Sequence, residues 1–318
     1  MARKKRLRST FCGNPAGQGG ADPGLERAAG GRFVLQTRIG AGGMCEVFTA
    51  VDLRRVESGD VRPVVALKRL LPEFAHRRQA QAALAREYLT LCRMAHPGIV
   101  RVFDLHRERW GLCFSMELLK GAPAHVVLGS RPGGLGTEGL AAAVGVFESL
   151  AYVHSRDVVH GDVKPANVHL GRSGRTVLLD FNAARPLSRS GKSGDSEGGK
   201  CAGRGGLVGL SVLHAGPEIL AGAPFTPAGD VFSASCTVYE MLTGQHPFRM
   251  LPAREAEACG LRPERPSSLG RGRWAALRRG LAFDPAERPT AGRLCAVFGD
   301  EGWPERLRRA LWRKGAGQ

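Results

Sequence analysis

The stretch Val158-Val-His-Gly-Asp-Val-Lys-Pro-Ala-Asn-Val-His-Leu170 carries the most specific pattern in the sequence. Two apolar residues lead into His160, and Asp162, Lys164 and Asn167 follow at short spacings. A carboxylate, a cation and an amide oxygen in one loop can orient an attacking hydroxyl, offset charge on a phosphoryl group and help to hold Mg²⁺. The pattern predicts that Asp162 accepts the hydroxyl proton, Lys164 stabilises the transferring group and Asn167 binds the metal.

A second carboxylate follows a short apolar run further along the chain. Thr176-Val-Leu-Leu is typical of a buried strand, and Asp180 and Phe181 come at its end. Because Mg²⁺ prefers oxygen ligands, we expect Asp180 to bind the metal together with Asn167 and to bridge it to phosphate oxygens. These side chains predict one site for a nucleotide and its metal ion.

A glycine-rich stretch lies between two strand-like runs near the start of the chain. It reads Ile39-Gly-Ala-Gly-Gly-Met-Cys-Glu-Val-Phe48, and glycines let backbone N–H groups approach phosphate oxygens closely. A Rossmann or P-loop site would have a helix directly after the glycines, whereas here a further strand follows and ends in Val65-Ala-Leu-Lys68. This order is the protein-kinase form of a phosphate-binding loop. The residues expected to contact ATP from this region are Ile39, Gly40, Gly42, Gly43, Val47 and Ala66.

Lys68 lies among apolar neighbours on this strand, and a buried ammonium group needs a partner. Glu87 follows within a helical pattern over residues 80–94 and can supply a carboxylate. We expect the pair to hold Lys68 against the α- and β-phosphates.

Together these motifs make the chain resemble the eukaryotic-type serine/threonine protein kinases found in bacteria, over about residues 33–300. The resemblance implies a hinge at Met116, Glu117 and Leu118 that binds adenine through backbone groups, with His169 under the ring. It also implies a catalytic role for Ser211, which stands where the family has a threonine or serine that contacts the catalytic aspartate and lysine. The cofactors implied are ATP and Mg²⁺, with Mn²⁺ as an alternative.

The resemblance extends to structural elements of the second half of the chain. Gly216-Pro-Glu218 resembles the end of the family's activation segment, and Asp284-Pro-Ala-Glu-Arg288 resembles its closing motif. We expect an ion pair between Glu218 and Arg288 that is structural and takes no part in the chemistry.

The fold class implied is α+β, a bilobal protein-kinase-like fold with a small antiparallel β lobe carrying one helix and a larger, mainly α-helical lobe. The expected organisation is a flexible basic, glycine-rich tail at 1–31, a nucleotide-binding lobe at 32–119, a catalytic lobe at 120–300 and a basic amphipathic segment at 301–318. A long mobile loop is expected at 188–209.

Four positions depart from the family pattern. Cys45 replaces the third glycine of the loop, Gly161 the arginine before the catalytic aspartate, Asn182 the glycine after Asp-Phe, and His169 an aliphatic residue under adenine. Without the arginine at 161, switching by phosphorylation of the activation loop is less expected, because that arginine pairs with the loop phosphate.

These departures keep alternative functions open. A nucleotide-binding pseudokinase that acts as a scaffold is one, although the six metal-, phosphate- and hydroxyl-contacting residues are all present. A small-molecule phosphotransferase of the aminoglycoside type is another, because such enzymes share the triplet His160-Gly-Asp162, but they normally lack Lys164 and the Gly-Pro-Glu218 element.

Composition limits the remaining classes. The chain has 318 residues and a formal net charge of +17, but its basic residues are scattered and no aromatic-plus-basic recognition motif accompanies them, so no specific nucleic-acid partner is expected. None of the eight cysteines forms a C-x-x-C pair, which predicts reduced thiols and a cytoplasmic location. No apolar run is long enough to span a membrane. The expected partners are a protein substrate and, as a candidate, a separate regulatory protein.

Overall fold

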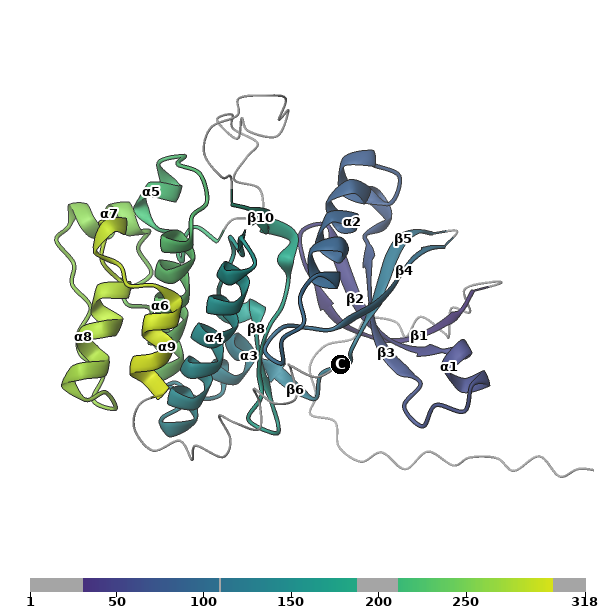
Figure 1. The fold of residues 1–318 in the computed structure, drawn as a ribbon, viewed down its shortest axis with the longest axis horizontal. Coiled ribbons are helices and arrows are strands. Elements are labelled where there is room, and N and C mark those ends of the chain that lie inside the picture. Colours follow the sequence, from purple (N-terminus) through teal and green to yellow (C-terminus); the bar gives the residue numbers. More distant parts are fainter. Residues whose placement is uncertain (1–30, 109, 188–210, 300–318) are drawn as a thin grey trace, which may run out of the picture.

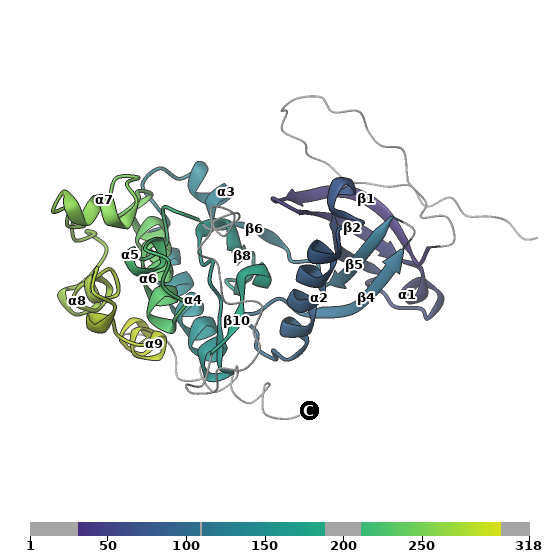
Figure 2. The same cartoon turned by 90° about the horizontal axis from the view of Figure 1, so that it is seen from above.

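The structure is a computed structural model that describes residues 31–108, 110–187 and 211–299 (Figure 1). Two lobes lie side by side, and two views at right angles separate a sheet-rich part from a helical part (Figure 2). The expected tail at 1–31, mobile loop at 188–209 and amphipathic segment at 301–318 fall, apart from Gly31, outside the described residues.

The small lobe is a five-stranded antiparallel sheet of order β1-β2-β3-β5-β4. Its strands are β1 (Phe33–Ala41), β2 (Cys45–Asp52), β3 (Val64–Leu70), β4 (Val102–Glu108) and β5 (Gly111–Met116). Every second residue of β2 is buried, as expected for a strand with one face on a core. A short helix, α1 (Leu53–Glu57), follows β2, and α2 (Arg78–Cys92) packs beside the sheet.

The large lobe is mainly helical and surrounds one buried helix, α6 (Pro227–Thr243). Thr226 caps α6 by accepting a hydrogen bond from Gly229 N (3.2 Å), Pro227 occupies its first turn, and Gly244 ends it at φ 72°. Most of its residues are buried, so the helix is the centre of the lobe. The other helices are α3 (Ala124–Gly129), α4 (Thr137–Ser155), α5 (Pro217–Leu220), α7 (Ala253–Ala258), α8 (Arg271–Gly280) and α9 (Ala291–Gly299).

Short strands at the boundary between the lobes carry the loops of the candidate site. They are β6 (Gly121–Pro123), β7 (Val158–Val159), β8 (Val168–Gly171), β9 (Thr176–Leu178) and β10 (Arg185–Pro186). Strands β6, β8 and β9 form one sheet, and β7 pairs with β10. One apolar core runs from Leu84 and Leu91 of α2 to Leu178 of β9 and to Phe181, which follows β9, and so joins the two lobes.

The predicted α+β bilobal fold is confirmed. The helical pattern expected at 80–94 corresponds to α2, which begins at Arg78 and ends at Cys92. The boundary between the lobes at residues 119 and 120 stays a prediction. The chain passes from the small lobe to the large lobe between β5 and β6. Among the described residues, no helix is long and apolar enough to cross a membrane. The thiols of Cys45, Cys92, Cys113, Cys236 and Cys259 form no disulfide.

Candidate active site

The loop between β7 and β8, which we predict to be the catalytic loop, is held by Asp230 of α6. Its carboxylate accepts hydrogen bonds from the backbone N–H groups of His160 (2.7 Å) and Gly161 (2.8 Å), and His154 Nε2 lies 2.9 Å away. Gly161 has φ 81°, and a Cβ at this position would lie 3.0 Å from the carbonyl oxygen of Ala183. The loop therefore turns sharply at a residue without a side chain, and Asp162 follows directly.

Asp162 is buried, and its two carboxylate oxygens have different surroundings. Oδ2 lies 2.6 Å from Lys164 Nζ and accepts from Asn167 Nδ2 at 3.0 Å, while the same amide donates to the Asp162 carbonyl oxygen at 2.8 Å. Oδ1 is buried and has no hydrogen-bond partner among the described residues. A buried carboxylate oxygen without a partner is costly, so Oδ1 is suited to accept a hydrogen bond from a bound molecule.

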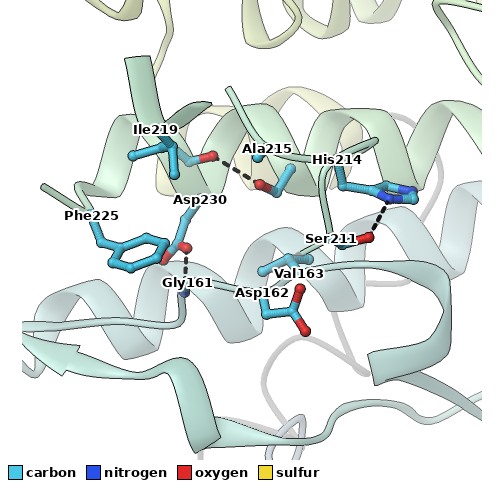
Figure 3. Close-up of a pocket in the computed structure, with 11 residues that line it drawn as sticks. Gly161, Asp162, Val163, Ser211, His214, Ala215, Ile219, Phe225 and Asp230 are labelled. Atoms are coloured by element: carbon cyan, nitrogen blue, oxygen red, sulfur yellow. Dashed lines mark hydrogen bonds between the residues drawn. The ribbon is translucent and has the colours of Figure 1, made fainter. Parts of the chain in front are cut away.

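A pocket lies beside Asp162 between the catalytic loop, the segment that begins at Ser211, and α6 (Figure 3). Ser211 lines it, but the Ser211 hydroxyl lies 3.2 Å from His214 Nδ1, and no hydrogen bond joins it to Asp162 or Lys164 in the described part of the chain. The contact implied for Ser211 by the resemblance is thus replaced here by one to His214. The other lining residues include Val163, Ala215, Ile219, Phe225, Gly229 and Ser233.

Lys68 links the two lobes through three short contacts. Its Nζ lies 2.6 and 2.8 Å from the carboxylate oxygens of Glu87 and 3.0 Å from Asp180 Oδ1. Burial opposes the ammonium charge of Lys68, but the two carboxylates outweigh it and raise the pKa of Lys68. Lys68, placed by β3, therefore stays protonated beside Glu87 from α2 and Asp180 from the large lobe.

The two carboxylates around Lys68 have pKa values shifted in opposite directions. Burial raises the pKa of Glu87, and Lys68 opposes this shift. Burial would also raise the pKa of Asp180, but the nearby Lys68 ammonium outweighs it and lowers that pKa. Asp180 is thus held ionised, which its predicted role as a metal ligand requires.

The backbone after β9 places Asp180 in an uncommon conformation. Its φ is 59°, in the left-handed region that aspartate tolerates better than most residues. Phe181 and Asn182 follow in one turn of 3₁₀-helix, and the Phe181 ring packs against His160 with ring centres 4.6 Å apart. His160 Nε2 lies 3.1 Å from the carbonyl oxygen of Leu179, so the catalytic loop and the Asp180 segment are packed as one unit.

The glycine-rich loop connects β1 and β2 at the edge of the small lobe. Gly42 N donates to Cys45 O (2.8 Å), and a Cβ at Gly40 would contact Val47. Ile39 is half exposed, and nothing lies within 4 Å of a Cβ built at Gly43. Burial raises the pKa of the Cys45 thiol to about 11, so this cysteine is a neutral side chain at the position of the third glycine.

The hinge region continues from β5. Ala66 of β3 pairs with Met116, and the Glu117 carboxylate accepts two hydrogen bonds from Arg175 (2.8 and 2.9 Å), which leaves its side chain a structural role. Leu118 is partly exposed. His169 of β8 is buried, burial lowers its pKa, and its Nδ1 has no hydrogen-bond partner among the described residues.

Of two structural contacts around the site, one was predicted from the sequence and one was not. The ion pair of Arg288 with Glu218 (2.6 and 2.9 Å) is present as the resemblance implied. The anchoring role of Asp230 was missed; its one signal was an acidic residue near the start of a mainly apolar helix. Because the contact joins residues some seventy positions apart, the sequence spacing could not assign it.

Comparisons with known proteins agree with this geometry. The model of the protein kinase domain matches residues 33–297, most of the chain. The chain belongs to the protein kinase family. This kinase chain is 32% identical over 84% of its length to the serine/threonine-protein kinase PkaA of Streptomyces coelicolor, of which it covers 49%. It is 32% identical over 70% of its length to PknJ of Mycobacterium tuberculosis and covers 36% of that protein. The chain thus spans about half or less of the length of these curated relatives.

Proposed function

We propose that this kinase chain is an ATP-dependent serine/threonine protein kinase that transfers the γ-phosphoryl group of ATP to hydroxyls of other proteins. The observation that carries the proposal is the position of Lys68. Its Nζ is held by Glu87 of the small lobe and lies 3.0 Å from Asp180 of the large lobe. The two lobes therefore meet at a cation and a carboxylate that suit nucleotide phosphates and their metal ion.

The side chains present fit ATP and Mg²⁺. Asn167 and Asp180 supply the oxygen ligands that Mg²⁺ prefers, and Asp180 is kept ionised by Lys68. The phosphates would be held by Lys68 and by the backbone of Gly40, Gly42 and Gly43. Adenine would lie against Ile39, Val47, Ala66, Met116, Leu118 and His169, with hydrogen bonds from the hinge backbone that includes Glu117.

In this proposal, the protein groups act mainly by position and charge. ATP bound with the metal supplies the phosphoryl group. Asp162 orients the serine or threonine hydroxyl through the unpaired Oδ1 and takes its proton, and Lys164 offsets charge on the group in transfer. Ser211 lines the pocket beside Asp162, where we expect the acceptor chain to bind; we call this pocket the acceptor pocket. Lys164 favours serine and threonine over tyrosine as acceptors, since the family's tyrosine-specific members usually lack it.

The alternatives are less well supported by the geometry. A pseudokinase would be expected to lack some of the residues that bind phosphate or metal, but all of them are present here. Of the departures from the family pattern, Asn182 fits into the turn after Asp180, and Cys45 is a neutral side chain. A small-molecule phosphotransferase would not need the Glu218–Arg288 pair, which fixes the segment next to the acceptor pocket. The relatives that match are named as serine/threonine-protein kinases.

The proposal is tested by incubating the purified chain with γ-labelled ATP and Mg²⁺, alone and with myelin basic protein. Wild type is expected to label itself or the acceptor on serine or threonine, and Asp162→Asn to bind nucleotide but lose labelling at least a hundredfold. Asp60→Asn, a surface change in the small lobe, serves as the control and should behave as wild type. Equal labelling by wild type and Asp162→Asn would overturn the catalytic assignment, and nucleotide binding without any labelling by wild type would favour the scaffold.

The acceptor protein, the upstream signal and any separate regulatory partner stay predictions, as does the cytoplasmic location. Mn²⁺ in place of Mg²⁺ is also a prediction, and the same labelling assay with each metal in turn tests it.

A further inference from the structure

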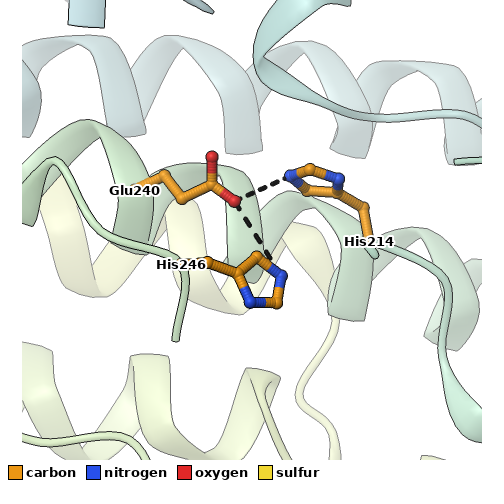
Figure 4. A group of neighbouring side chains, drawn as sticks. All are labelled: His214, Glu240 and His246. Carbon is orange, nitrogen blue, oxygen red and sulfur yellow. Dashed lines mark hydrogen bonds and ion pairs between the residues drawn. The ribbon is translucent and has the colours of Figure 1, made fainter. Parts of the chain in front are cut away.

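Three side chains form a polar cluster behind the acceptor pocket: His214, Glu240 and His246 (Figure 4). His214 Nε2 lies 2.9 Å and His246 Nε2 3.9 Å from the same oxygen of Glu240. Both histidines are buried, and the two rings meet edge to face. His214 belongs to the segment Ser211–Ala215, which we call the pocket segment. Glu240 belongs to α6, and His246 lies in the loop after α6.

The ligand atoms of the cluster lie within 4.8 Å of one another, which is close enough to surround a metal ion. The hydrogen bonds of His246 argue against one. Its Nδ1 accepts from the backbone N–H groups of Phe248 and Met250 (3.2 Å each), so the proton of the neutral ring is on Nε2. A protonated nitrogen cannot bind a metal, and moving the proton to Nδ1 would set it against two N–H donors.

The proton on Nε2 instead reaches the pocket segment. His246 Nε2 donates to the carbonyl oxygen of Leu213 at 2.9 Å. Leu213 lies between Ser211 and His214, both of which line the pocket beside Asp162. One imidazole therefore connects the loop after α6 to the wall of the acceptor pocket.

The loop that carries His246 is held in an unfavourable backbone conformation. Arg249 and Met250 both have positive φ, 52° and 63°. Residues other than glycine are disfavoured in this region of backbone conformation, and they persist there when the surrounding contacts determine them. The bond from Met250 N to His246 Nδ1 is one such determinant, so the ring both fixes its own loop and projects its Nε2–H in one direction.

We propose that His246 is a positioning residue for the protein substrate: its Nε2–H holds the segment Ser211–Ala215 in the conformation that accepts a hydroxyl-bearing chain beside Asp162. The inference rests on the proposed function, because it assigns a role in the use of the acceptor. His246 acts through Leu213, and its polar partners in the described part of the chain include none of the residues proposed to bind nucleotide or metal. The titratable groups that face its ring are His214 from the pocket segment and Glu240 from α6, and burial keeps the ring neutral by lowering its pKa.

Two conservative variants separate the two hydrogen-bonding sides of the ring. Gln at this position places an amide donor near Nε2 and can keep the bond to Leu213 O. Asn places an acceptor near Nδ1 and can keep the bonds from Phe248 and Met250, but it cannot reach Leu213. His246→Gln is therefore the matched control for His246→Asn.

The first measurement is steady-state kinetics in two series, one that varies the concentration of myelin basic protein and one that varies the concentration of ATP. We expect His246→Asn to lower kcat/KM for the acceptor about tenfold, the effect of one lost hydrogen bond, with KM for ATP and basal ATP hydrolysis unchanged. His246→Gln should stay within about threefold of wild type. An equal loss in both variants, or a parallel rise in KM for ATP, would overturn the positioning role.

The second measurement does not depend on catalysis. Amide hydrogen exchange of His214 and Ala215, whose N–H groups bond to Ser211 O (3.0 and 3.1 Å), reports the order of the pocket segment. Exchange should be faster in His246→Asn than in wild type and close to wild type in His246→Gln. If wild type transfers no phosphoryl group to protein but exchange follows this pattern, the proposed function fails while the link from His246 to the segment holds. Unchanged exchange in His246→Asn would refute the link itself.

Discussion

Replacing Glu87 by Gln tests the contact between the lobes most directly. The change keeps the size of the side chain and removes its charge, and it leaves Lys68 with one carboxylate partner in place of two. Both residues are buried, with 3% of Glu87 and 8% of Lys68 exposed, so water cannot replace the lost carboxylate. Lys68 Nζ is then expected to move toward Asp180, its remaining partner at 3.0 Å.

The magnitude follows from the distances. Unit charges about 2.7 Å apart attract by roughly 6 kcal/mol at an effective dielectric constant of about 20, and desolvation offsets part of this. Removing one partner of a buried pair costs about 3–5 kcal/mol, and because Asp180 stays in contact with Lys68 we expect the lower end, about 3 kcal/mol of unfolding free energy. Displacement of Lys68 from the phosphates should also lower kcat/KM for ATP about a hundredfold.

Urea unfolding without nucleotide and steady-state kinetics with Mg²⁺–ATP measure the two effects separately. Glu138→Gln is the control: Glu138 pairs with Arg131 at 2.6 Å, but its side chain is 69% exposed, and such pairs contribute at most about 1 kcal/mol. If the unfolding free energy of Glu87→Gln is within about 1 kcal/mol of the wild-type value and its kcat/KM for ATP is unchanged, the buried pair does not hold Lys68 and the reasoning is wrong.

Three further predictions concern the frame of the site. Arg288→Lys should lower the unfolding free energy by about 3 kcal/mol, as measured by urea unfolding, because lysine cannot reproduce the two parallel bonds to Glu218. Burial lowers the pKa of His96 from 6.5 to about 4, so the folded state releases a proton that the unfolded state keeps; stability should fall as pH drops from 6.5 toward 4, with a shallower slope in His96→Gln. Gly161→Ala and Gly174→Ala, at φ 81° and 80°, should each cost about 1 kcal/mol, but only the former should lower kcat, since nothing lies within 4 Å of a Cβ at 174.

Short-range chemistry could be predicted from the sequence. Asp162, Lys164 and Asn167 lie within six positions, and a loop of that length brings them together in almost any arrangement of the flanking strands. The approach of Lys68 to Asp180 crosses more than a hundred positions and came from the family resemblance, because a fold and not a spacing brings β3 to the end of β9. The fold class likewise came from the family resemblance, to which the order of glycine, strand and lysine contributed.

Contacts made by single buried polar groups could not be predicted. The Ser211 hydroxyl was expected at the catalytic pair and lies instead beside His214, since a histidine at 214 offers a ring nitrogen at the right distance. The direction of a buried hydrogen bond depends on the rotamer and tautomer of its partner, and neither is encoded in a local pattern. The proton of His246 is the same case: its position follows from two backbone amides that the chain brings to the ring only after folding.

The buried helix α6 is mainly apolar, and three of its polar residues contact the loops around the site. Asp230 accepts hydrogen bonds from the loop that carries Asp162, the Thr237 hydroxyl lies 3.4 Å from Val163 O, and Glu240 contacts His214 of the pocket segment. These three are spaced by seven and three positions, which places them near one side of the helix. A single helix thereby contacts both the loop that carries Asp162 and the wall of the pocket beside it. A buried polar group is costly unless it is paired, so each of these contacts favours one arrangement of the loops over slightly shifted ones. The positions of the side chains in the site therefore depend on the packing of α6 in the core.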